Sequence, residues 1–206
     1  MTSEVDICNL ALLRLGTRSS MASLSEGSTE SNACAQVYAL SRDLLLSAHP
    51  WTFANQRTVL ADLGSPPQSW RYRYAYPNDC LKTREVHSTD LSAALVPYSV
   101  AGDFDTQGST IKVILCNSPN AELTYTARVT NPDLFPAHFI EALAWMIASE
   151  LSSSLCADMA ISQYAVQMAT QTVLSSRSSD ANEGFGIQHA VPEWIAARGC
   201  SSSMQK

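Results

Sequence analysis

The apolar residues of this 206-residue chain change their spacing twice along the sequence. They recur every three to four residues up to about residue 50, at every second residue from about 51 to 130, and every three to four residues again after that. The first spacing is typical of helices with one buried face and the second of strands. Because runs of helices are segregated from runs of strands, the sequence predicts an α+β protein.

The predicted architecture is an antiparallel helical bundle built from residues 1–50 and 131–178, with an antiparallel β subdomain, residues 51–130, inserted into it. In the first helix Ser3 supplies a cap and Gly16 a stop. The second helix should end at about residue 48 or 49, because Pro50 disfavours helical geometry at His49. Its expected buried face comprises Cys34, Val37, Tyr38, Leu44, Leu45 and Ala48.

Two further helices are expected after residue 130, through AHFIEALAWMIASELSSSLC and over roughly residues 157–176. The apolar stripe of the first comprises Phe139, Leu143, Met146, Ile147, Leu151 and Leu155. The spacing repeats in the second with Ile161, Tyr164, Ala165, Met168 and Thr172. Together with the earlier helices, these stripes need partners to cover them, which favours a bundle.

The β subdomain is predicted from alternation in several short runs. The stretch SWRYRYAYP places its tyrosines on one face of a strand and Arg71 and Arg73 on the other, and LTYTARV repeats the pattern. Residues 110–115 form a mostly apolar strand, and weaker strands are expected near 81–87 and 95–100. Arginines beside tyrosines could also form a nucleic-acid surface, but they point to opposite sides of the strand, so a structural sheet is favoured.

The amino-acid composition limits the classes of function that the chain can have. Charged residues make up 16% of the chain and the net charge is −6, so no overall basic field favours binding to phosphate backbones. The six cysteines are dispersed without a C-x-x-C pair and are expected to be reduced core residues. No signal peptide or membrane span is predicted, and the chain is expected to be a soluble protein made in the cytosol.

No catalytic, cofactor-binding or metal-binding residue is predicted. The four histidines, at 49, 87, 138 and 189, lack metal-ligand spacing, and no nucleophile motif is present. His49 is instead expected to donate to free carbonyls at the end of the second helix. Asp103 and Asp105 alternate onto one face and could form a carboxylate pair for glycoside hydrolysis, although a solvated turn is the simpler interpretation.

The last part of the chain, residues 179–206, is predicted to be a flexible arm. It is rich in serine and glycine and carries only isolated apolar residues, which suits a segment that orders against a neighbouring molecule. The candidate interface residues in this arm are Phe185, Ile187, Val191, Trp194 and Ile195.

Several stretches in order are similar to one family. These are DICNLALLRLG, SLSEGSTESNACAQVYALSRDLLLSAHPWTFANQR, WRYRYAYPNDCLKTREV and LTYTARVTNPDLFPAHFIEALAWMIASELS. Together they resemble the head-to-tail adaptor proteins of short-tailed bacteriophages, also called tail tubular protein A. The resemblance covers most of residues 6–151, and its specificity comes from the order and spacing of the pieces.

The resemblance implies a structural virion protein without enzymatic activity, made in the bacterial cytoplasm and located in the tail. About a dozen copies, a dodecamer, would form a ring between the portal protein and the tail nozzle protein and contact tail fibres in some members. The ring would extend the DNA channel without specific DNA binding, a cofactor or a membrane. The alternative hypothesis is a virion-associated glycan or peptidoglycan hydrolase that uses the two aspartates.

Overall fold

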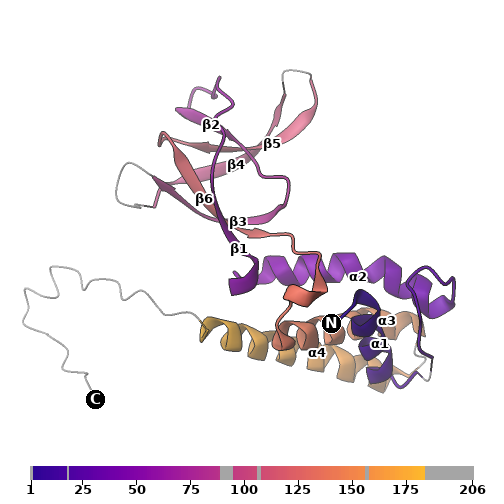
Figure 1. The fold of residues 1–206 in the computed structure, drawn as a ribbon. Coiled ribbons are helices and arrows are strands. Elements are labelled where there is room, and N and C mark those ends of the chain that lie inside the picture. The colour runs from indigo at the N-terminus through magenta and orange to yellow at the C-terminus, as the bar shows by residue number, and fades with distance from the viewer. Residues whose placement is uncertain (1, 18, 89–94, 106–107, 156–157, 184–206) are drawn as a thin grey trace, which may run out of the picture.

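The computed structural model describes residues 2–17, 19–88, 95–105, 108–155 and 158–183. In this part of the chain four α-helices lie together at one end of the molecule, and two three-stranded antiparallel sheets lie at the other (Figure 1). The helices come from both sides of the strand-forming segment in the sequence. The predicted α+β class is therefore correct, and we refer to the two parts as the helical region and the β region.

The helical region contains four α-helices and two short 3₁₀-helices. Their bounds are α1 Glu4–Arg14, α2 Thr29–Ala48, η1 Thr52–Ala54, η2 Pro132–Leu134, α3 Ala137–Leu155 and α4 Met159–Ala181. As predicted, Ser3 caps α1: its side chain accepts from the backbone N–H of Asp6, whose carboxylate accepts from the N–H of Ser3. Gly16 follows the helix with φ +75°, a conformation that favours glycine.

Helix α3 is the centre of the helical region and packs against α1, α2 and α4. Its buried residues surround most of the helix axis, since Ala142, Leu143, Ala144 and Trp145 are all buried in succession. A helix that is apolar on nearly every side needs neighbours on nearly every side. On α4 the small residue Ala165 is buried, which allows a close approach to α3.

The buried face of α2 differs in part from the prediction. Leu44 and Ala48 were assigned to that face but are exposed, whereas Ser41 and Arg42 are buried. Successive residues are separated by 100° around a helix, so Leu44 lies at the margin of a stripe centred on Cys34 and Leu45. Arg42 is tolerated because its guanidinium pairs with Asp43 at 2.9 Å.

Helix α4 continues to Ala181, so the predicted boundary of the arm at residue 179 is wrong by three residues. The Ser176 hydroxyl donates to the backbone carbonyl of His138 at 2.7 Å, and Asp180 is buried against residues near α2. These polar contacts extend the helix through a segment whose serine-rich composition gave no apolar signal.

The six strands form two sheets, in the orders β1–β6–β3 and β2–β5–β4. Their bounds are β1 Asn55–Val59, β2 Tyr72–Ala75, β3 Cys80–Ser88, β4 Tyr98–Phe104, β5 Thr110–Cys116 and β6 Ala121–Ala127. The two sheets share one core, which comprises Leu60, Tyr74, Val86, Ile114, Cys116, Ala121, Leu123, Tyr125 and Ala127. Strand β1 was not predicted, because its sequence NQRTV is polar and mostly exposed.

The chain joins the two sheets at two corners. Beyond β1, the N–H of Leu63 donates to the carbonyl of Arg73 in β2 at 2.8 Å. Before β4, the N–H of Val96 donates to the carbonyl of Val86 in β3 at 2.8 Å. These bonds pair part of the outer edges of β2 and β3, which stabilises the β region as a small barrel-like unit.

Trp51 stabilises the junction between α2 and the rest of the chain. It is fully buried, and its ring contacts Phe139 edge-on at a centroid distance of 5.1 Å. Its indole Nε1–H donates to the carbonyl of Leu45 at 2.8 Å. The sequence predicted that His49 would satisfy a carbonyl at this helix end. In the structure Trp51 donates to that end of the helix instead, while His49 turns toward α4.

We expect Trp51→Phe to lower the free energy of unfolding by about 1–3 kcal/mol, because it removes buried contacts and leaves the Leu45 carbonyl without its donor. Chemical denaturation monitored by far-UV circular dichroism measures this. The matched control is Trp70→Phe, at a half-buried tryptophan outside the helical region. Equal losses in the two variants would contradict a special role for the Trp51 hydrogen bond.

Candidate functional site

Asp180 is a buried carboxylate that joins the end of α4 to the segment after α2. Its side chain accepts from the backbone N–H of Thr52 at 3.1 Å and from the Thr52 hydroxyl at 2.9 Å. Its second oxygen lies 3.2 Å from Nε2 of His49. Three donors therefore surround one carboxylate that is 3% exposed, which satisfies the need of a buried charge for hydrogen bonds.

The order of these groups is not that of a nucleophilic triad. In a triad the histidine lies between the acid and the hydroxyl, so that it can take the hydroxyl proton. Here Asp180 lies between Thr52 and His49 and binds both directly. The arrangement joins two chain segments and does not activate the Thr52 hydroxyl.

Burial lowers the pKa of His49 below its ordinary value of about 6.5, and with the positive charges of Arg177 and Arg84 it outweighs the opposing influence of Asp180. The imidazole is therefore neutral at neutral pH and can donate one hydrogen bond. Since the pKa is lower in the folded chain, the stability linked to this group is present above about pH 6.5 and declines as the pH falls below that value.

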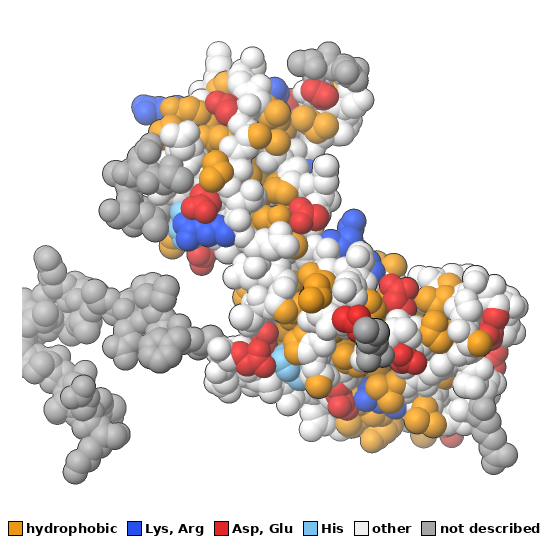
Figure 2. Space-filling view, in the orientation of Figure 1, with side chains coloured by type: hydrophobic (Ala, Val, Ile, Leu, Met, Phe, Trp, Pro, Cys, Tyr) orange, Lys and Arg blue, Asp and Glu red, His pale blue; other side chains and the backbone are white. Residues whose placement is uncertain are grey.

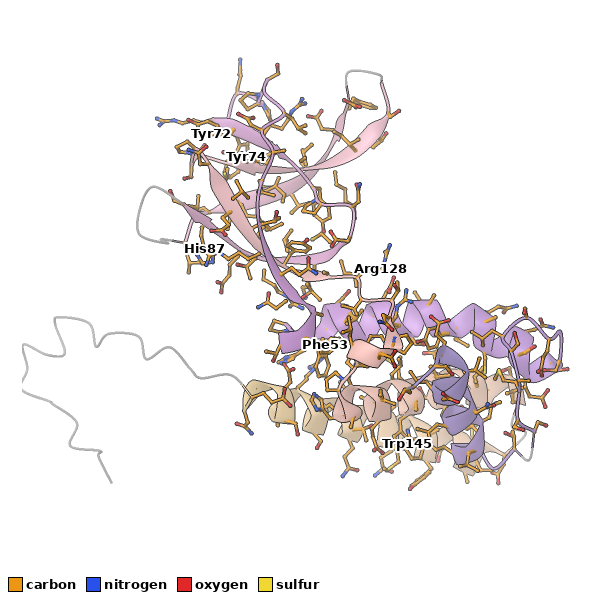
Figure 3. The ribbon with its side chains drawn as sticks, viewed as in Figure 1. Phe53, Tyr72, Tyr74, His87, Arg128 and Trp145 are labelled. Carbon is orange, nitrogen blue, oxygen red and sulfur yellow. The ribbon has the colours of Figure 1, made fainter. Side chains whose placement is uncertain are left out.

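Leu81 of β3 packs against the core of the helical region, and directed polar contacts between the two regions lie beside it. Arg84 of β3 donates from its side chain to the carbonyl of Ser47 in α2 at 3.1 Å and to the Thr126 hydroxyl at 2.9 Å. Arg128, which lies at the base of the β region in Figure 3, pairs with Asp43 of α2 at 3.0 Å. Directed hydrogen bonds of this kind fix the orientation of one region on the other.

The two aspartates considered for hydrolysis, Asp103 and Asp105, lie in different surroundings. Asp103 pairs with Arg73 at 2.6 Å and accepts from the N–H of Phe104, and these bonds hold its pKa below the ordinary range of a carboxyl. Asp105 belongs to the turn after β4, where its N–H donates to Ser109 and its carbonyl accepts from Gly108. A glycosidase acid needs a raised pKa, so the setting of Asp103 disfavours that role.

Two of the described histidines contact the Trp51 ring, although they are far apart in the sequence. The His49 ring is 5.0 Å and the His138 ring 6.1 Å from the Trp51 ring. His87 belongs to the β region instead (Figure 3). Within the described residues no group of three or more histidine, cysteine or acidic side chains could hold a metal ion.

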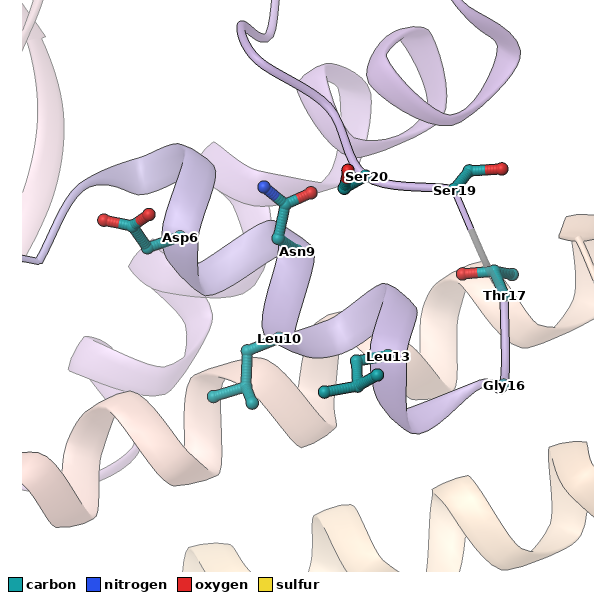
Figure 4. Close-up of a pocket in the computed structure, with 8 residues that line it drawn as sticks. All are labelled: Asp6, Asn9, Leu10, Leu13, Gly16, Thr17, Ser19 and Ser20. Atoms are coloured by element: carbon teal, nitrogen blue, oxygen red, sulfur yellow. The ribbon is translucent and has the colours of Figure 1, made fainter.

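A hollow of about 680 Å³ lies beside α1 and the loop that follows it (Figure 4). Its lining residues are Asp6, Asn9, Leu10, Leu13, Gly16, Thr17, Ser19 and Ser20. Asn9 exchanges two hydrogen bonds of 2.9 Å with the backbone of Met21, and Thr17 donates to Leu12. Asn9 and Thr17 thus stabilise the loop, so the hollow is best explained as a structural feature.

Large apolar side chains are exposed on both regions, and Figure 2 shows such patches over the helices and the strands. Those more than 60% exposed are Leu13, Leu40, Val59, Leu95, Phe104 and Met159. Where such side chains gather on a surface, they can be buried against another chain. We therefore regard these surfaces, and not a cleft, as the candidate functional site.

The interface residues predicted from the sequence, Phe185, Ile187, Val191, Trp194 and Ile195, lie outside the described residues. Asp180 and Arg84 were missed, because a lone acid in a serine-rich stretch and an arginine in a weak strand carry no motif. The exposed leucines were missed because periodicity locates the centre of a buried stripe better than its margins.

The sequence matches no protein-family model and no curated protein. Among the helices in the described part of the chain, none combines the length and the apolar character that a membrane crossing requires.

We expect Asp180→Ala to lower the free energy of unfolding by about 2–4 kcal/mol, because Thr52 and His49 lose a buried acceptor. Thermal and urea denaturation measure the loss. The matched control is Asp133→Ala, at an exposed aspartate for which a change below about 0.5 kcal/mol is expected. If the Asp180 variant is as stable as the control, the carboxylate does not stabilise the junction.

Proposed function

We propose that this chain is a structural virion protein, a head-to-tail adaptor that forms a ring between portal and tail nozzle. The resemblance of its ordered sequence stretches to the adaptor family suggests this role, and a bundle of helices from both chain ends with an extended arm is the finer architecture it implies. In such a ring each subunit contacts two neighbours, the portal and the nozzle, and in some members tail fibres.

The exposed apolar residues of both regions are the observation that best supports the proposal. An adaptor subunit must bury surface against neighbours on several sides, and its interfaces need apolar residues at their centres. Leu13, Leu40 and Met159 on the helices, and Val59, Leu95 and Phe104 on the β region, provide such residues. A net charge of −6 also suits a channel through which DNA slides without binding.

The hydrolase alternative has less support. An enzyme that cleaves glycosidic bonds needs a concave site with one protonated carboxyl group. The ion pair of Asp103 with Arg73 favours the charged form of Asp103, whereas the acid of a glycosidase must be protonated.

Native mass measurement of the full chain, alone and with purified portal protein, tests the proposal. We expect the chain to bind the portal as a closed ring of about a dozen copies, because a ring on a symmetric portal repeats one contact around the axis. A chain that never binds a portal and cleaves cell-wall sugars would contradict the adaptor function.

We further expect Phe104→Asp to weaken assembly at least tenfold while leaving the fold intact, because a charge replaces a 65% exposed apolar ring near the end of β4. Analytical ultracentrifugation with portal measures assembly, and circular dichroism measures folding. The matched control is Ser99→Asp, an exposed polar position on the same strand. Normal assembly of the Phe104 variant would exclude this end of the β region from the interfaces.

A further inference from the structure

An apolar groove of about 340 Å³ runs between α2 and α4 in the helical region. Leu44 and Ala48 of α2 form one wall, Val173 and Leu174 of α4 form the other, and Met146 of α3 also lines it. Leu44 and Leu174 are half exposed or more. The volume lies at the lower end of the range that holds small ligands, so the groove suits a few apolar side chains.

Arg177 lies at this groove and lacks a partner for part of its side chain. Its Nε is buried and makes no hydrogen bond within the described residues, and no ion pair is formed there by its guanidinium. A buried donor without an acceptor costs free energy, so an occupant with a carboxylate would stabilise it. The groove therefore suits an occupant that combines apolar side chains with one acid.

Residues 191–195 of the same chain, VPEWI, have this chemistry. Val191, Trp194 and Ile195 recur at i, i+3 and i+4, which is the spacing of side chains that insert together into a groove. Glu193 supplies the carboxylate. An aromatic anchor beside an acid complements an apolar groove with a cation.

The chain is long enough to reach the groove from the end of α4. The seven residues 184–190 span up to ~23 Å when extended. The distance back along α4 from Ala181 to Thr170 is ~16 Å. Because α4 ends next to the groove, the segment is held at a high effective concentration, which favours the groove of its own chain over that of a second copy.

We propose that residues 191–195 dock in the groove between α2 and α4 of their own chain, with Trp194 and its apolar neighbours between Leu44 and Leu174 and with Glu193 on Arg177. The proposal does not depend on the adaptor function, since it concerns the isolated chain.

Trypsin cleavage after Arg198, followed by mass spectrometry on the full chain, tests the docking. Cleavage tracks the population of the undocked segment. Leu174→Glu should speed cleavage by roughly tenfold, because it places a carboxylate in the apolar groove beside the acid of the segment. The matched control, Leu40→Glu, changes an equally exposed leucine of α2 that does not line the groove, and its cleavage rate should equal that of the unmodified chain.

The charge pair has its own test. Glu193→Lys should also speed cleavage after Arg198, and adding Arg177→Glu should restore slow cleavage. For these variants an arginine-specific protease replaces trypsin, because trypsin would also cleave at the new lysine. All rates should stay constant over about a hundredfold range of protein concentration, as expected for docking within one chain. Equal rates of cleavage after Arg198 in the unmodified chain, Leu174→Glu and Glu193→Lys would overturn the proposal, as would protection that increases with concentration, which would indicate the segment of a second copy.

Discussion

The carboxylate of Asp180 connects the end of α4 to the segment that leads from α2 into the β region. Pro50 ends α2, and Trp51 then fills the space beside Phe139 while its indole satisfies the Leu45 carbonyl. Thr52 and His49 on either side both reach Asp180. Because a buried carboxylate is stable only with its donors in place, α4 and the segment after α2 hold each other in position.

Much of the fold follows from periodicity and from a few residues with strong local preferences. The helical spacing located all four α-helices, and Ser3, Gly16 and Pro50 set boundaries that the structure keeps. Strand β1 and the last turn of α4 were missed for the same reason: both are polar segments whose structure depends on distant partners. Tertiary hydrogen bonds are not encoded in a local pattern, so a single sequence gives no signal for Asp180.

The candidate site was less predictable than the fold. The histidines and the paired aspartates are the candidates that the sequence offers, because these residues carry recognisable chemistry. In the structure His49 contacts the buried carboxylate of Asp180, and Asp103 forms an ion pair with Arg73. Exposed leucines such as Leu44 are invisible to pattern analysis, because a position at the margin of a helical stripe can be buried or exposed according to how its neighbours pack.

The groove is relevant to the proposed adaptor function, because both concern exposed apolar surface. A ring subunit must present apolar surface to its partners and yet remain soluble before it meets them. A segment that covers the α2–α4 groove in the free chain would hide part of that surface, and its release would free both the groove and the apolar residues of the segment for neighbouring subunits. The segment and a neighbouring subunit would compete for the same residues. The free energy gained on assembly would therefore have to exceed the free energy of docking, which opposes premature association of free subunits.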